Sequence, residues 1–75
     1  MLLKNYDKAI QACQKAIELN SEEAWNWAYL GMVYDAAELN EKAYEAYNKA
    51  VELNPNINER VKKSRDSLAK KLQKE

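Results

Sequence analysis

Histidine and phenylalanine are absent from this 75-residue sequence, and glycine, proline and cysteine occur once each. With so few turn-forming residues for β-hairpins, the sequence predicts an all-α fold. Without histidine and with one cysteine, neither a nucleophile–base relay nor a thiolate or imidazole metal site can be assembled. A single glycine also excludes a glycine-rich phosphate-binding loop. We therefore predict a protein that is not an enzyme and has no cofactor, with a carboxylate-only metal site as an open alternative.

The sequence has no long apolar run, and no secretory leader is expected. Its apolar runs are only a few residues long, which is too short for a membrane span, and polar residues follow Met1–Leu3 at once. The lone Cys13 cannot form an internal disulfide, so it is interpreted as a small, buried or half-buried apolar residue in a reducing compartment. These features predict a cytoplasmic protein without membrane contact.

Charge is balanced overall but unevenly distributed. The chain has 12 Lys or Arg and 12 Asp or Glu, and 47% of its residues are hydrophobic, a composition typical of a folded soluble domain. Residues 58–75 carry seven basic and three acidic residues, whereas residues 1–57 are acidic overall. Because the basic segment has no aromatic residue on which a base could stack, we predict a solvated surface rather than a nucleic-acid site.

The sequence nearly repeats itself after 34 residues. Residues 6–20 and 40–54 are identical at eight of fifteen positions, including KAIELN in the first copy and KAVELN in the second. A fixed period of this length is typical of stacked helical units, each too small to bury its own apolar face. Apolar spacing and end signals, including a capping box of Asn20 with Glu23 and a helix-opening Pro55, predict four helices. Their expected ranges are about Asn5–Leu19, Glu22–Ala37, Glu41–Leu53 and Ile57–Lys74.

One known repeat pattern, W-x₂-L-G-x₂-Y…A-x₃-F…P, fits this sequence with a single aromatic exchange. The matching residues are Trp27, Leu30, Gly31, Tyr34, Ala43, Tyr47 (for Phe) and Pro55. On these residues the chain resembles the tetratricopeptide repeat family. The resemblance implies one all-α domain over residues 1–75, made of antiparallel helix-turn-helix repeats. It divides into half a repeat (1–23), a full repeat (24–57) and a C-terminal capping helix (58–75).

The predicted second helix is apolar on both sides. Trp27, Leu30, Gly31 and Tyr34 share the face expected to pack in the core, with the small residues Ala43 and Ala50 expected opposite Gly31. On the other side, the resemblance implies a concave peptide-binding groove. The implied groove residues are Trp25, Ala28, Met32, Asp35 and Ala36.

The groove chemistry narrows the class of partner. The face lacks the Lys, Asn and Arg groups with which some family members clamp a terminal carboxylate. We therefore predict that it binds an apolar protein segment whose Lys or Arg meets Asp35. The alternative is that Trp25 and Met32 lie against the last helix or another copy of the chain.

The turn between the second and third predicted helices has no helix breaker. Residues 36–43 contain neither Gly nor Pro, although the family usually places Gly here, and most of them are good helix formers. The two helices could join as one rod of about 32 residues, roughly 48 Å long, and exchange halves in a domain-swapped homodimer. Docking of Leu39 and capping by Asn40 would favour a monomer. The alternative to a peptide-binding scaffold is thus a purely structural repeat fragment that contacts only its own copies.

Overall fold

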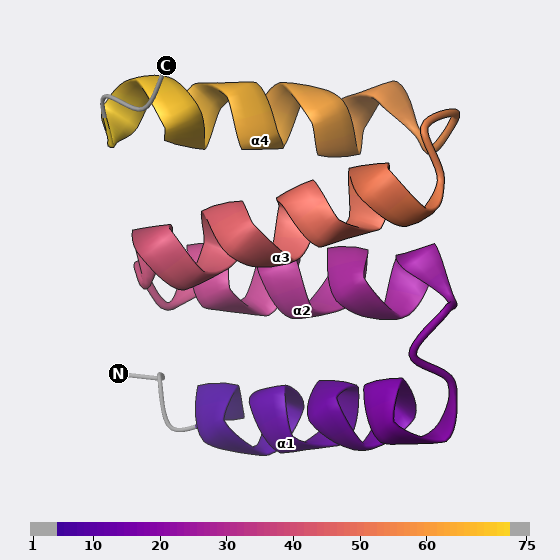
Figure 1. The fold of residues 1–75 in the computed structure, drawn as a ribbon. Coiled ribbons are helices and arrows are strands. Elements are labelled where there is room, and N and C mark those ends of the chain that lie inside the picture. The colour runs from indigo at the N-terminus through magenta and orange to yellow at the C-terminus, as the bar shows by residue number, and fades with distance from the viewer. Residues whose placement is uncertain (1–4, 73–75) are drawn as a thin grey trace.

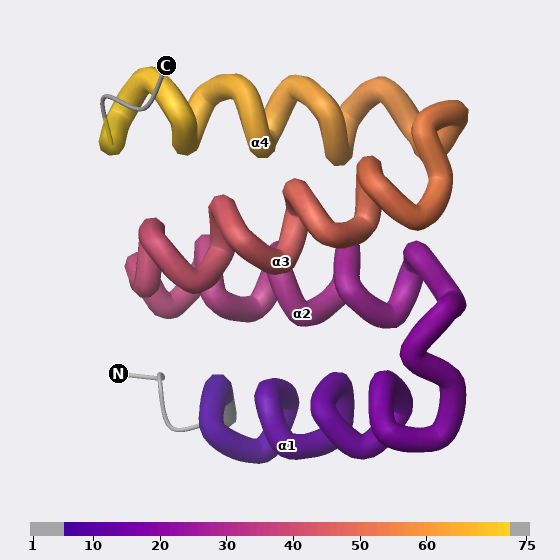
Figure 2. Tube along the Cα trace, in the orientation of Figure 1, coloured from indigo at the N-terminus to yellow at the C-terminus, as the bar shows by residue number. Residues whose placement is uncertain are grey.

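The computed structural model describes residues 5–72, which form four helices joined by short turns. Figure 1 shows that each helix runs antiparallel to the one before it, and Figure 2 traces the same path along the backbone. Each helix packs mainly against its neighbour in sequence. The prediction of an all-α, antiparallel helix-turn-helix fold is therefore confirmed. The helices are α1 (Asn5–Leu19), α2 (Ala24–Ala36), α3 (Asn40–Leu53) and α4 (Glu59–Lys71).

The helix ends differ from the predicted ones because different side chains cap them. Glu23, not Asn20, is the N-cap of α2, and its carboxylate accepts a hydrogen bond from the Trp25 N–H at 3.3 Å. The predicted capping box is therefore wrong. Asn58 caps α4 by accepting from the Arg60 N–H at 2.7 Å, so α4 begins after the predicted start. Its predicted end at Lys74 lies outside the described residues.

The most extensive contact between two helices is that of α2 with α3. Gly31 of α2 faces the ring of Tyr47, and a Cβ atom at Gly31 would lie 2.8 Å from the Tyr47 Cδ1 atom. Sequence reasoning placed Ala43 and Ala50 opposite this glycine; both are fully buried, but the atoms nearest to Gly31 belong to Tyr47. The glycine is therefore required by the aromatic ring that packs against it.

Two side chains of α2 hold the end of α1 in place. The Asn26 Nδ2 group donates hydrogen bonds to the carbonyl oxygens of Ala16 and Asn20, both at 3.2 Å. The Trp27 Nε1–H donates to the Ser21 carbonyl oxygen at 3.0 Å. The Ala16 and Asn20 carbonyl oxygens also accept backbone hydrogen bonds, from the Asn20 and Glu23 N–H groups, so the α2 side chains add a second bond to each and tie α2 to the end of α1.

At the other end of the stack, α4 covers α3 with an apolar stripe. Val61 and Leu68 are each 2% exposed, and Arg65 donates a hydrogen bond to the Asn48 side chain of α3 at 3.4 Å. The opposite side of α4 presents exposed charged residues such as Lys63 and Lys70. Within residues 5–72, no helix is long and apolar enough to span a bilayer.

Candidate functional site

The outer side of α2 carries an apolar stripe, here called the aromatic face, formed by Trp25, Tyr29, Met32 and Ala36. Tyr29 is 52% exposed and Met32 is 38% exposed, while Trp25 is half-buried against the core. The Trp25 and Tyr29 ring centroids are 5.7 Å apart and the ring planes are tilted by 38°. These residues follow the i, i+4, i+7 spacing of one helix face. Tyr29 is not among the residues expected to contact a partner, although its position four residues after Trp25 puts it on the same helix face.

The five predicted groove residues do not form one surface. Trp25, Met32 and Ala36 belong to the aromatic face, whereas Asp35 is half-buried and lines a depression against α4. Ala28 is fully buried, with 0% exposure. Its small side chain lies in the core, so the expectation that Ala28 contacts a partner needs correction.

The depression beside Asp35 is lined mainly by polar groups of α4. It has a volume of about 300 Å³, and the cations of Arg60, Lys63 and Lys71 share it with Asp35. The hydroxyl groups of Ser64 and Ser67 also line it. Three cations against one carboxylate give this depression a net positive charge, which sequence reasoning missed because it depends on how α4 packs beside α2.

Tyr47 connects the core to this depression. Burial raises the pKa of the Tyr47 phenol above its usual value, the nearby Asp35 carboxylate raises it further, and a hydrogen bond with Ser64 lowers it. A raised pKa means that the folded protein holds the phenol proton more tightly than the unfolded chain does. The contribution to stability is therefore present below the pKa of an unfolded tyrosine, about 10, and is lost as pH rises through the folded pKa.

We expect Tyr47→Phe to reduce the loss of stability at alkaline pH. The phenylalanine has no proton to release, so its free energy of unfolding should fall less between neutral pH and about pH 11 than that of the wild type. Urea unfolding across this pH range, followed by circular dichroism, measures the difference. If the stability of the two proteins depended equally on pH, the raised pKa of the Tyr47 phenol would be contradicted.

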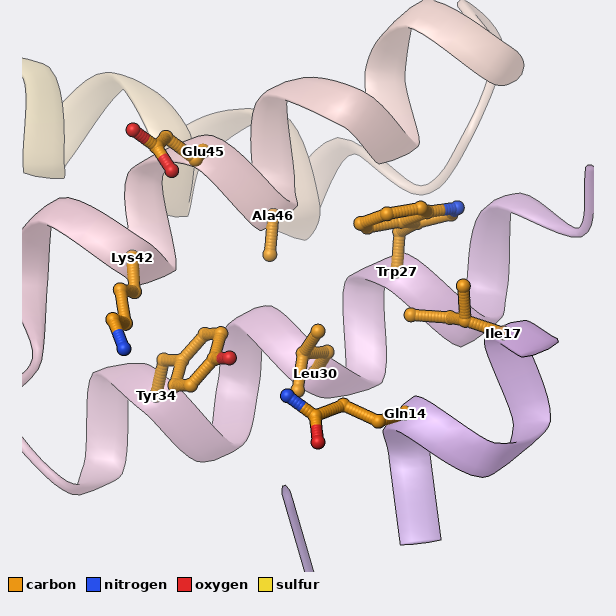
Figure 3. A pocket seen from close by; sticks show the side chains of 8 residues that line it. All are labelled: Gln14, Ile17, Trp27, Leu30, Tyr34, Lys42, Glu45 and Ala46. Atoms are coloured by element: carbon orange, nitrogen blue, oxygen red, sulfur yellow. The ribbon is translucent and has the colours of Figure 1, made fainter. Parts of the chain in front are cut away.

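A second cleft lies between α1, α2 and α3, with a volume of about 330 Å³ (Figure 3). Ile17, Leu30 and Ala46 contribute apolar walls, one from each helix, and Trp27 closes one side. Trp27 was expected in the core but is half-buried. The cleft depends on the spacing between helices that are not adjacent in sequence, so the local sequence pattern gave no sign of it.

Cys13 of α1 is a free, half-buried cysteine. Burial raises the pKa of its thiol, which favours the protonated, weakly nucleophilic form at neutral pH. The structure thus agrees with the interpretation of Cys13 as a small apolar residue that packs against the core.

Comparison with known proteins identifies the repeat. Family models described as tetratricopeptide repeat match residues 1–23 and residues 24–57. Over 47 residues the chain is 43% identical to the general transcriptional corepressor ssn6 of Schizosaccharomyces pombe, a match that covers 63% of this chain and 4% of that protein. The chain thus spans a small fraction of that relative's length, and no solved structure matches it. By its helices, its motif residues and these matches, the chain belongs to the tetratricopeptide repeat family, whose repeats serve as protein–protein interaction scaffolds.

Proposed function

We propose that the chain is a non-catalytic scaffold that binds an apolar segment of another protein on the aromatic face of α2. The observation that carries the proposal is the exposure of Tyr29 and Met32 beside the half-buried Trp25. Adjacent exposed apolar side chains mark interaction surfaces, and rigid aromatic side chains give contact area at low cost in conformational entropy.

The dimensions of the aromatic face indicate the size of segment that would fit. From Trp25 to Ala36 the helix rises about 16 Å at 1.5 Å per residue. A partner helix of about three turns or an extended segment of about five residues covers this length. The face lies along a single helix, so the partner's own side chains must surround Met32 to exclude water from it.

The charge preference of the partner is a separate step of the proposal. The sequence-based prediction is that a Lys or Arg of the partner meets Asp35. Because Arg60, Lys63 and Lys71 line the same depression as Asp35, they would repel a further cation. We therefore propose that apolar contacts give most of the affinity, and that Asp35 only discriminates between partners.

The second candidate function is a structural repeat whose contacts are with its own copies. It is favoured by the packing of Trp25 against the core, which makes part of this side chain inaccessible to any partner.

We propose that the protein is located in the cytoplasm. The alternative location is the nucleus, which the similarity to a transcriptional corepressor supports.

We expect Met32→Glu to weaken partner binding at least tenfold while helix content stays unchanged. The substitution places a charge in the middle of a surface that loses water on binding, and Met32 is exposed enough for the fold to accept it. The probes are peptides selected from a displayed library on the wild-type protein, each also made with a Lys or a Glu at one end. Fluorescence anisotropy gives the affinities and circular dichroism the helix content.

Leu19→Glu is the matched control, because Leu19 is 78% exposed at the end of α1, outside the aromatic face. It should leave affinity unchanged. Failure to select any peptide, or equal weakening by both substitutions, would contradict binding at this face. Unfolding of Met32→Glu would show instead that the face belongs to the core. Tighter binding of the Glu-ended peptides would overturn only the predicted basic partner residue.

A further inference from the structure

The turn between α2 and α3 contains a residue in the left-handed region of backbone conformation. Glu38 has a φ of 63°, and it is the one non-glycine residue with positive φ in the described part of the chain. The Leu39 N–H donates to the Tyr34 carbonyl oxygen at 2.8 Å, and the Glu38 N–H donates to the Asp35 carbonyl oxygen at 3.0 Å. This hydrogen-bond pattern ends many helices, but the left-handed position is usually glycine. A residue with a side chain is disfavoured there by about fivefold or more.

The N-terminus of α3 is also held weakly. Its N-cap is Leu39, which has no side-chain hydrogen bond to the helix, whereas Glu23 caps α2 and Asn58 caps α4. The expectation that Asn40 caps this helix is wrong, because Asn40 is its first helical residue. Leu39 is 42% exposed, so it does not dock fully into the hairpin. The turn thus lacks the glycine, the cap and the buried anchor that hold such turns closed.

Right-handed helical conformations at Glu38 and at Leu39, whose ψ is now 74°, would remove both defects at once. Residues 37–39 would then continue the helix, and α2 and α3 would form one rod of about 30 residues, about 45 Å long. Gly31 and Tyr47 are 16 positions apart in sequence, so on such a rod they would lie about 24 Å apart and could not touch. The contacts between α2 and α3 would have to come from elsewhere.

We propose that this turn is a hinge for domain swapping and that the partner is a second copy of the chain. In the swapped dimer, α3 and α4 of one copy pack against α1 and α2 of the other, and every contact of the hairpin is made again between chains. The balance between monomer and dimer then depends on the two hinges. The aromatic face of α2 is not used, so this inference is independent of the proposed peptide binding.

Substitution of Glu38 tests the hinge directly. Glycine accepts the left-handed conformation freely and is disfavoured within a helix by about fivefold, so Glu38→Gly favours the monomer in both respects. Since each dimer contains two hinges, we expect Glu38→Gly to raise the dimer dissociation constant by at least about 100-fold. Glu38→Ala is the matched control, because alanine carries the same left-handed penalty and favours the continuous helix. Its dissociation constant should stay within a few-fold of the wild-type value.

The measurement is mass by light scattering, after refolding from urea over a wide range of protein concentration. Refolding is needed because an exchange of halves requires the hairpin to open. A wild type that remains monomeric at every concentration would overturn the proposal. So would a dimer whose dissociation constant is unaffected by Glu38→Gly.

A mixing experiment distinguishes a swapped dimer from any other. Gly31→Leu alone brings a new side chain against the Tyr47 ring, and Tyr47→Ala alone leaves a cavity. When the two variants are refolded together, a swapped dimer forms one native Gly31–Tyr47 contact and one contact in which the new leucine meets the vacated space. The mixture should therefore unfold at a higher temperature than either variant. If it does not, the halves are not exchanged and the proposal fails.

Discussion

Tyr47→Ala should lower the free energy of unfolding by about 3–5 kcal/mol, the range measured for removal of large aromatic side chains from protein cores. Tyr47 is only 3% exposed, and its ring packs directly on the backbone of α2 at Gly31. Its removal leaves a cavity at the junction of α2 and α3, the helix pair with the most extensive contact in the described residues. Urea unfolding monitored by circular dichroism at neutral pH measures the loss.

Tyr29→Ala provides the comparison, since it removes the same side chain from an exposed position. Tyr29 is 52% exposed on the aromatic face, and we expect a loss of less than about 1 kcal/mol. If the two substitutions destabilised the protein equally, the assignment of Tyr47 to the core and of Tyr29 to the surface would be contradicted.

Gly31→Leu should lower the free energy of unfolding by about 2 kcal/mol through the opposite effect. Even a Cβ atom at this position would lie 2.8–2.9 Å from two atoms of the Tyr47 ring, so a larger side chain forces the helices apart at a cost of about 3 kcal/mol. Replacing glycine within a helix returns about 1 kcal/mol. The net loss is measured by urea unfolding as before.

The double variant shows whether the two effects share a cause. With Tyr47→Ala in place, the leucine at position 31 enters space that the ring has left, so the double variant should be more stable than the sum of the two losses predicts. Additive losses would mean that the leucine meets something other than the Tyr47 ring.

The fold could be predicted from the sequence because the motif residues and their spacing determine the helices locally. The 34-residue repeat and the helical spacing can be read directly from the sequence, and so can the need for a small residue at position 31. The residue that packs against Gly31 could not be predicted, because Tyr47 reaches it only at the particular angle between α2 and α3. Capping was mistaken for a similar reason: Glu23 and Asn20 both offer acceptors in one turn, and backbone geometry selects between them.

The sequence predicted which helix carries the candidate site, but not which residues of that helix share the exposed face. The sequence identified α2 as apolar on both sides, and it placed Trp25 and Met32 away from the core contact. It could not separate Ala28 and Asp35 from them, because tertiary packing makes that separation: Ala28 is buried in the core, and Asp35 lines a depression together with residues of α4. A residue on the boundary between two faces of a helix is assigned only when the next helix is in place.

Packing between sequence neighbours has a consequence for the way the fold forms. Since each helix packs mainly against the next helix in the chain, few distant segments must meet, and the entropy lost in closing loops is small. Stability is then approximately a sum of links between adjacent units rather than a property of one central core. Within residues 5–72, α2 and α3 each have two neighbouring helices whereas α1 and α4 each have one, so cooperativity in this part of the chain is strongest at α2 and α3.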